Sequence, residues 1–254
     1  MRDVGLDEAI KAAGGVSELA RRIGISQPSV SSWDRIPAER VIAVEAATNV
    51  GREILRPDLY RRSDIDDVDV ARAQEYALLA TLLSRAPSAS LLSKLSQLRG
   101  DATPLGVAHA ALAEAASRTT EQRAEREFFN LFIGLGRGEL LPYGSYYLTG
   151  FLHERPLARL RDDLARIGVE RSEGNSEPED HAALVCEVMS GLADGSLSAS
   201  EETQRQFFDS HVVPWMGRFF GDLENAESAE LYRPVGTLGR VFIEIEMESF
   251  ALPK

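Results

Sequence analysis

Apolar residues recur three or four positions apart along most of this 254-residue chain, which is the spacing of one helix face. Leu79, Leu82 and Leu83 mark such a face within a helix expected over 68–85. Further helices are expected over 88–99, 104–117, 121–133, 156–167 and 182–192. Residues 243–248 also alternate like a strand, but no partner strand is evident, and we interpret them as helix. Because strands do not alternate with helices, the sequence predicts an all-α fold.

Charge divides the chain into two parts. Residues 1–62 carry 10 Lys/Arg and 9 Asp/Glu, for a net charge of +1, whereas residues 63–254 carry 18 and 31, for a net charge of -13. Between the two parts, Pro57 and a run of alternating charges interrupt the apolar pattern. We therefore expect a domain over 1–62 and a larger one over 63–254. The overall charge of -12 disfavours binding of the whole chain to nucleic acid or anionic lipid.

The sequence also limits the compartment. Its one cysteine, Cys186, cannot form an internal disulfide. The first residues carry charges where a secretory signal needs an apolar stretch. The longest charge-free stretch, 140–153, is too short and too polar to span a bilayer. We expect a cytoplasmic protein without a membrane span.

A helix-turn-helix pattern lies within the first part. Ala20 is small enough for two helices to cross closely, Gly24 permits a tight turn, and Val30 is apolar on the inner face of the second helix. Short polar side chains then face outward, where they suit base edges in the major groove. The residues that we expect to contact DNA are Ser17, Arg21, Gln27, Ser29, Ser31, Ser32 and Arg35.

Residues 6–60 resemble the Cro/YdaS-like phage repressor family in this pattern and in the Trp33 and Ile36-Pro37-Ala38 segments that follow. The resemblance implies binding to double-stranded DNA, and such small domains gain affinity by dimerising, so a homodimer is expected. A net charge of +1 is nevertheless small for phosphate neutralisation. The phosphate contacts would come from four arginines: Arg21, Arg22, Arg35 and Arg40.

An aromatic segment stands out in the second part. Phe128, Leu131 and Phe132 have helical spacing, which fits core packing as well as a binding surface. The glycine-rich residues 134–138 then end the helix, and a long loop over 139–147 with three tyrosines is expected to be functional. Ligands for a metal are not grouped, and the glycines do not follow a strand as in a nucleotide-binding loop. We therefore assign no metal and no cofactor.

A helix start signal follows over 176–181, the sequence Ser-Glu-Pro-Glu-Asp-His. We interpret Ser176 as the N-cap and the acidic residues as complements of the helix dipole. Asp180 and His181 are adjacent, so their side chains point in different directions, and no Ser or Cys nucleophile is placed beside them. We therefore assign no catalytic residues and expect that the protein is not an enzyme.

Residues 70–250 resemble the TorD/DmsD redox-enzyme maturation chaperones in the aromatic segment, the proline-tyrosine loop and the Glu-Pro-Glu-Asp-His sequence. The resemblance implies an all-α protein that binds an apo molybdenum-cofactor oxidoreductase, or its signal peptide, before export by the twin-arginine route. By the same resemblance, the peptide site is lined or supported by Phe128, Leu131, Phe132, Pro142, Tyr143, Ser145, Tyr147, Asp180 and His181. We expect the tyrosine-bearing loop and the Asp-His segment to face each other across a cleft.

Three functions fit these observations. The first is a chaperone whose N-terminal DNA-binding domain couples maturation to transcription. The second is a transcriptional regulator whose helical C-terminal domain only dimerises or senses a ligand. The third is a chaperone whose N-terminal domain has lost DNA binding and recognises another protein.

Overall fold

The computed structural model describes residues 3–59, 67–170 and 177–251. Within these ranges the chain forms helices and no strand, apart from one isolated antiparallel bridge between Tyr143 and His181. The predicted all-α fold is confirmed. The chain separates into two compact units, Met1–Ile65 and Asp66–Lys254, each of which is described by itself.

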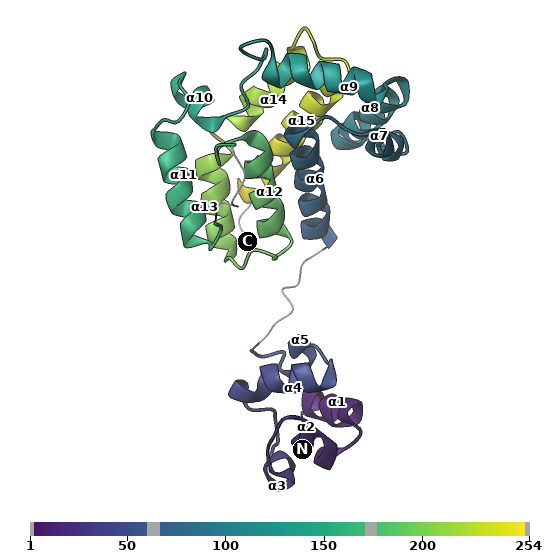
Figure 1. Cartoon of the computed structure of the whole chain (residues 1–254), viewed down its shortest axis with the longest axis vertical. Helices are drawn as coiled ribbons and strands as arrows, with labels where there is room; N and C mark the ends of the chain where they lie inside the picture. Colours follow the sequence, from purple (N-terminus) through teal and green to yellow (C-terminus); the bar gives the residue numbers. More distant parts are fainter. Residues whose placement is uncertain (1–2, 60–66, 171–176, 252–254) are drawn as a thin grey trace. The chain divides into compact units, whose positions relative to one another are not determined.

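The first unit is a bundle of short helices around an aliphatic core (Figure 1). Its elements are α1 (Val4–Ala13), α2 (Val16–Arg22), α3 (Gln27–Ser31), the 3-10 turn η1 (Ala38–Arg40), α4 (Val41–Thr48) and α5 (Arg52–Leu55). Ala20 and Val30 are buried, and Gly24 has a φ of 70°, as the helix-turn-helix pattern predicts. Ser26 caps α3, because its hydroxyl accepts the Ser29 N–H at 3.4 Å.

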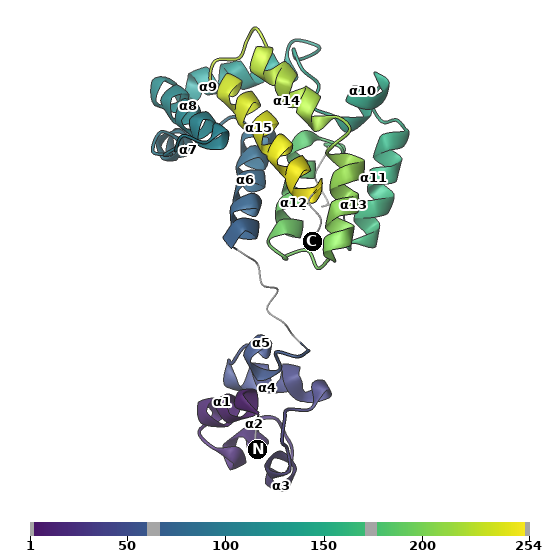
Figure 2. The same cartoon turned by 180° about the vertical axis from the view of Figure 1, so that it is seen from behind.

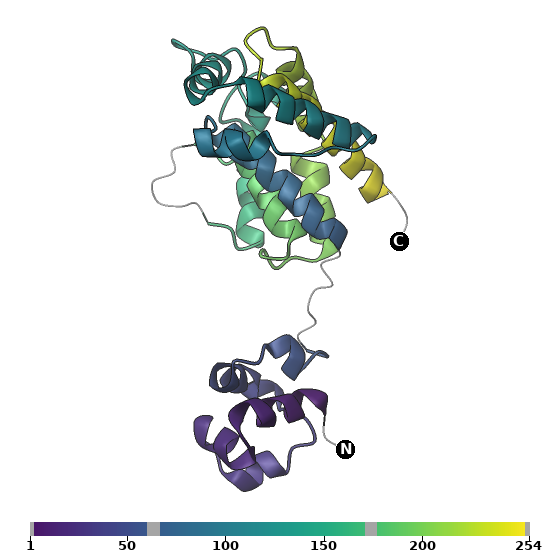
Figure 3. The ribbon, with the colours of Figure 1, turned by 90° about the vertical axis from the view of Figure 1, so that its right-hand side faces the viewer.

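The second unit is a larger helical assembly. Its elements are α6 (Asp67–Ser84), α7 (Ala89–Leu95), α8 (Pro104–Arg118), α9 (Glu121–Phe128), the π-helix η2 (Phe129–Ile133), α10 (Gly144–Thr149), α11 (Arg155–Arg166), α12 (Ala182–Ala193), α13 (Glu201–His211), α14 (Met216–Asn225) and α15 (Tyr232–Ala251). Helix α6 packs along α12, as the side view shows (Figure 3). Helix α15 packs against α14 and α8 on the other side (Figure 2).

Aromatic side chains fill much of the second core. Tyr76, Phe208, Phe219, Phe220 and Tyr232 are fully buried, and each large apolar side chain taken out of water contributes about 1.5–3 kcal/mol. The thiol of Cys186 is also buried, which raises its pKa far above the ordinary value and keeps it protonated. This cysteine therefore acts as a small core residue.

Two buried carboxylates tie distant segments of this unit together. Glu246 on α15 accepts from Arg72 Nε at 2.7 Å and from the Tyr76 hydroxyl at 2.9 Å, both on α6. Glu127 accepts the backbone N–H groups of Glu230, Leu231 and Tyr232 at 2.7, 3.1 and 2.7 Å. It thereby satisfies donors at the start of α15 and fixes the end of α9.

The structure corrects three local expectations. Helix α10 occupies part of the expected loop, because Tyr147 packs against Trp215 and Phe219 from a later part of the chain. Helix α12 is capped by His181 and not by Ser176, which lies outside the described residues. The end of the aromatic segment is a π-helix, whereas 243–248 is helical as predicted.

Among the described residues, no helix combines the length and apolarity needed to cross a membrane.

Candidate functional site

The proline-tyrosine segment and the Asp-His segment are paired directly with each other. The Gly144 N–H donates to the Asp180 carbonyl at 2.9 Å, and the Ala182 N–H donates to the Pro142 carbonyl at 2.8 Å. The Ser145 N–H adds a bond to Asp180 Oδ2 at 2.7 Å. The expectation of a cleft between the two segments is therefore wrong, because backbone hydrogen bonds close that space.

A groove opens beside this bridge instead. Its volume is about 690 Å³, and its walls come from α6, η2, the bridge and α12. We call it the first groove. Five of the predicted site residues line it: Phe128, Phe132, Pro142, Tyr143 and His181. The fold thus brings these five residues, which are up to 53 positions apart in the chain, to one surface.

Phe128 and Phe132 form the aromatic wall of the first groove. Their rings meet edge to face with centroids 5.0 Å apart, and both pack against Tyr232 in the core. Each is only partly buried, so one side of each ring belongs to the core and the other to the groove. Since Glu127 caps α15 immediately before Phe128, the wall is anchored to the C-terminal helix.

His181 is held in one tautomer. Its Nδ1 accepts the Ala183 N–H at 3.1 Å as the N-cap of α12, so the proton of the neutral ring is on Nε2. Burial lowers the pKa of His181, which keeps the imidazole neutral near pH 7. The ring also packs edge to face on Tyr143 at 5.1 Å. The ring lines the first groove and retains Nε2–H as a donor.

Acidic side chains border the same groove. The Tyr143 hydroxyl donates to Glu177 at 2.7 Å, and burial beside this carboxylate raises the pKa of the Tyr143 phenol. Glu187 on α12 is exposed and also lines the groove, as does Asp194. The groove therefore offers aromatic carbon on one wall and carboxylates on another.

The other four predicted residues lie outside the lining of the first groove. Leu131 is fully buried in the core. Tyr147 donates its hydroxyl to Asp222 at 2.9 Å. Ser145 and Asp180 are buried behind the bridge that they help to form. These residues support the groove by fixing the segments that line it.

Sequence reasoning did not assign the α6 and α12 walls of the groove. Leu184 and Glu187 are three positions apart on α12, so both side chains lie on the same helix face and contribute to the lining. That spacing could have identified Glu187. The α6 contribution, including Ala77 and Thr81, carries no chemical signal in the sequence and follows only from helix packing.

The predicted DNA contacts of the first unit lie on α2, on α3 and in the turn after it. Ser17, Gln27, Ser29, Ser31 and Ser32 are all exposed. Several are also engaged locally. Gln27 Nε2 donates to the Ser31 hydroxyl at 2.9 Å, and the Ser32 hydroxyl donates to the Ser29 carbonyl at 2.8 Å. A DNA contact through these groups requires them to exchange partners.

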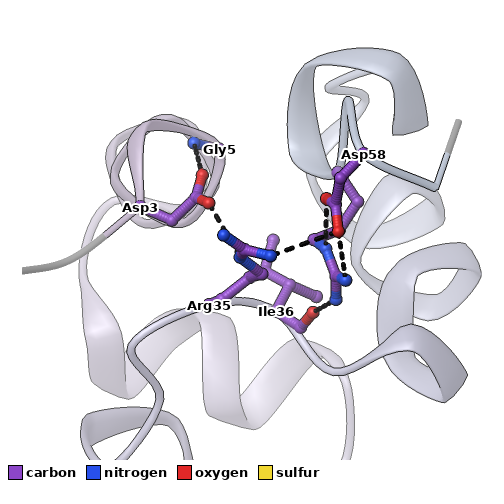
Figure 4. A network of polar contacts seen from close by, with 6 residues as sticks. Asp3, Gly5, Arg35, Ile36 and Asp58 are labelled. Carbon is purple, nitrogen blue, oxygen red and sulfur yellow. Dashed lines mark hydrogen bonds and ion pairs between the residues drawn. The ribbon is translucent and has the colours of Figure 1, made fainter. Parts of the chain in front are cut away.

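Most of the described arginines of this unit are bound to its own carboxylates. Arg35 Nε donates to Asp3 at 3.0 Å, and Arg35 Nη1 donates to Asp58 at 3.2 Å (Figure 4). Arg56 also pairs with Asp58. Arg21 Nε donates to Glu18 at 3.0 Å, which helps to lower the Glu18 pKa to about 2. Arg40 is exposed, and no carboxylate partner lies near it within the described part of the chain.

Each of the two units is similar to a known protein family. Residues 98–221 match the family of the nitrate reductase delta subunit, and residues 6–63 match the bacterial toxin YdaS family. The chaperone protein TorD of Vibrio cholerae serotype O1 (El Tor Inaba N16961) is 29% identical over 127 residues, covering 46% of this chain and 58% of the relative. The two resemblances predicted from the sequence are confirmed. We refer below to the YdaS-like unit (Met1–Ile65) and the TorD-like unit (Asp66–Lys254).

Another curated relative of the same name matches the TorD-like unit. The chaperone protein TorD of Vibrio atlanticus is 24% identical over 135 residues, covering 49% of this chain and 63% of the relative. A crystal structure assigned to redox enzyme maturation in Archaeoglobus fulgidus aligns with 19% identity and a TM-score of 0.44, over 68% of this chain and 93% of that one. The chain spans less than two thirds of the length of these curated relatives. The relatives are named as chaperones and not as enzymes.

Proposed function

We propose that the TorD-like unit is a cytoplasmic chaperone for a molybdenum-cofactor oxidoreductase that is exported by the twin-arginine route. It binds the signal peptide of the apo enzyme in the first groove. The observation that carries the proposal is the combination of an aromatic wall, Phe128 and Phe132, with the acidic border at Glu187 and Asp194.

The chemistry of the groove matches that of the peptide. A twin-arginine signal joins two guanidinium groups to an apolar stretch. The rings of Phe128 and Phe132 cover apolar side chains, whereas Glu187 pairs with a guanidinium group. The net charge of -13 over 63–254 draws a basic peptide toward this unit and speeds its encounter. His181 adds a neutral N–H donor to the lining.

Two substitutions of His181 separate binding from folding. His181→Asn retains an N-cap acceptor for the Ala183 N–H and removes the ring that lines the groove, whereas His181→Ala removes both. We expect both variants to bind a synthetic twin-arginine peptide severalfold more weakly than the wild type, by isothermal titration calorimetry. Only His181→Ala should lose stability. Wild-type affinity in His181→Asn would contradict the proposed role.

DNA binding by the YdaS-like unit is a second proposed function. It is supported by the exposed polar side chains on α3, which are suited to base edges. We expect Gln27→Ala to weaken binding to the DNA upstream of the chain's own operon in a gel-shift assay, without changing the helical content. If the wild type binds this DNA and unrelated DNA with equal affinity, and Gln27→Ala does the same, the binding is only non-specific.

A third proposal couples the two activities, so that client binding changes operator affinity. A gel-shift assay with and without the twin-arginine peptide tests it, and identical affinities would exclude coupling.

Two alternative functions predict different results. A regulator whose second unit only dimerises or senses a ligand binds the operator but captures no exported oxidoreductase. A chaperone whose first unit recognises another protein captures the client and does not bind DNA, which the intramolecular pairing of Arg21 and Arg35 favours.

A further inference from the structure

Both ends of the YdaS-like unit hold the same arginine. Arg35 lies in the turn after α3, and its Nε donates to Asp3, which precedes α1, at 3.0 Å. Its Nη1 donates to Asp58, which follows α5, at 3.2 Å. Figure 4 shows the Arg35 guanidinium group between these two carboxylates, which we call the clamp. A side chain that we expect to contact DNA is thus bound from two sides by its own unit.

The two carboxylates of the clamp do not depend on Arg35. Asp3 Oδ1 accepts the Gly5 N–H at 3.0 Å as the N-cap of α1. Asp58 accepts from both Nε and Nη2 of Arg56 at 2.8 Å, which is a bidentate pair. Each carboxylate therefore keeps a hydrogen-bond donor when Arg35 leaves.

The two arginines that share Asp58 differ in how easily they can leave it. The Arg56 side chain is 10% exposed and also donates to the Ile36 carbonyl, so loss of Asp58 would cost a buried charge its ion pair. The Arg35 side chain is 53% exposed, so another anion can replace its partners at little cost. Arg56 is therefore a structural partner of Asp58, and Arg35 is an exchangeable one.

The clamp also cancels the positive charge at this point of the surface. Arg35 and Arg56 pair with Asp3 and Asp58, so the four charges sum to zero. Non-specific affinity for DNA depends on cationic side chains that neutralise phosphates. Hydrogen bonding from Arg56 lowers the pKa of Asp58 to about 2, so this carboxylate stays charged near neutral pH. Release of Arg35 therefore requires a competing anion and not a proton.

We infer that Asp3 and Asp58 form an autoinhibitory clamp on Arg35, from which a DNA phosphate displaces them. The inference rests on the second proposed function, DNA binding by this unit. Random DNA offers mainly phosphate contacts, and the loss of two carboxylate partners offsets much of what such a contact contributes. A matching operator adds contacts between base edges and α3, and these contacts favour opening of the clamp. The clamp thus weakens non-specific binding and increases discrimination in favour of the operator.

Neutral substitutions in the whole chain open the clamp with little structural change. In Asp3→Asn the side-chain oxygen still caps α1, and in Asp58→Asn it still accepts from Arg56. The probe is a fluorescein-labelled DNA duplex of random sequence, and fluorescence anisotropy measures its affinity at several salt concentrations. The control, Asp7→Asn/Glu8→Gln, changes the net charge equally at two exposed positions on α1.

Asp3→Asn/Asp58→Asn should bind the random duplex severalfold more tightly than the wild type. The slope of log affinity against log salt concentration should become steeper by about 0.9, the value for one additional phosphate contact. Adding Arg35→Gln should return both the affinity and the slope close to the wild-type values. The control should leave the slope nearly unchanged. Equal changes in the control and in Asp3→Asn/Asp58→Asn would show that net charge alone acts, and would overturn the inference.

The remaining outcomes separate the clamp from DNA binding itself. If Asp3→Asn/Asp58→Asn binds the random duplex no more tightly than the wild type, the inference is overturned. The second proposed function then still stands, provided that the wild type binds the DNA upstream of its own operon. Absence of binding by every variant to either duplex overturns both.

A single substitution covers the case in which circular dichroism shows that Asp3→Asn/Asp58→Asn does not fold. Asp3→Asn alone keeps the cap of α1, because asparagine is a favoured N-cap residue. It should raise the affinity for the random duplex, and Asp3→Asn/Arg35→Gln should not. Equal affinities of these two variants would contradict the inference.

Discussion

The two units differ in how they use their charged groups. In the YdaS-like unit, the arginines are mostly bound to carboxylates of the same unit, as Arg35 is to Asp3 and Asp58. In the TorD-like unit, Glu187 faces an open groove, and Asp180 Oδ1 has no hydrogen-bond partner among the residues that the structure describes. The comparison teaches that net charge does not measure what is available to a ligand. A charge recruits a partner only where the chain itself leaves it unsatisfied.

The same comparison distinguishes buried from exposed ion pairs. Glu246 is 1% exposed and holds Arg72 and Tyr76 in the core. Glu246→Ala should lower the free energy of unfolding of the TorD-like unit by about 3–5 kcal/mol, because the guanidinium group of Arg72 loses its buried partner and keeps only Asp69, and the buried Tyr76 hydroxyl loses its acceptor. Urea unfolding followed by circular dichroism measures this. The control, Glu244→Ala, removes an exposed partner of Arg240 and should cost under about 1 kcal/mol. Similar losses in both variants would contradict the distinction.

The cap of α12 provides the next largest effect. His181→Ala should reduce stability by about 0.5–2 kcal/mol, whereas His181→Asn should stay close to the wild type because asparagine is a good N-cap. Thermal unfolding of the two variants measures the difference. Equal melting temperatures would show that the Nδ1 bond to Ala183 does not stabilise the helix.

Two histidines should give the TorD-like unit opposing pH dependences. The hydrogen bond that His109 Nε2 donates to the Glu75 carboxylate raises the pKa of His109 above 6.5, so the stabilising effect of this bond is present at low pH and is lost as pH rises through the folded-state pKa. Burial lowers the pKa of His181 below 6.5, so the native state loses stability as pH falls below that value.

Substitution isolates each histidine. Relative to the wild type, His109→Gln should be more destabilised at about pH 5.5 than at about pH 7.5, and His181→Asn should be less destabilised at the lower pH. Urea unfolding at both pH values measures these changes, which should be smaller than the loss of the α12 cap. A change of the same sign in both variants would contradict the assigned pKa directions.

The smallest effect is expected at the surface of the YdaS-like unit. The pair between Arg21 and Glu18 is exposed, so Glu18→Gln should leave stability nearly unchanged. If this unit binds DNA, freeing Arg21 should raise non-specific affinity and steepen its salt dependence. A gel-shift assay at two salt concentrations measures it. Unchanged affinity would favour the protein-interaction alternative for this unit.

Much of the fold was accessible from the sequence because helix periodicity is a local signal. Buried Leu79, Leu82 and Leu83 on α6 fit the predicted helix face. Helix α10 was missed because its stability comes from Tyr147 packing on Trp215 and Phe219, some 70 positions later. Periodicity within a six-residue helix cannot reveal such a distant contact.

The candidate site was accessible only in part. Phe128 and Phe132 could not be assigned to core or surface, and each in fact contributes to both. The divergence of Asp180 and His181 was expected from helix geometry, but it arises in extended chain immediately before α12. The direct pairing of Asp180 and Ala182 with residues 142–145 depends on backbone hydrogen bonds, and the residue types do not predict these bonds.

Site-specific cross-linking tests the central claim most directly. Ile133 lines the first groove and is 54% exposed, whereas Val107 on α8 is 58% exposed and lies outside it. A photo-reactive phenylalanine analogue placed at either position is equally accessible to solvent. The account predicts that the precursor of the exported oxidoreductase cross-links from position 133 through its signal peptide and not from position 107. Cross-linking from both positions with equal yield, or from neither, would contradict it.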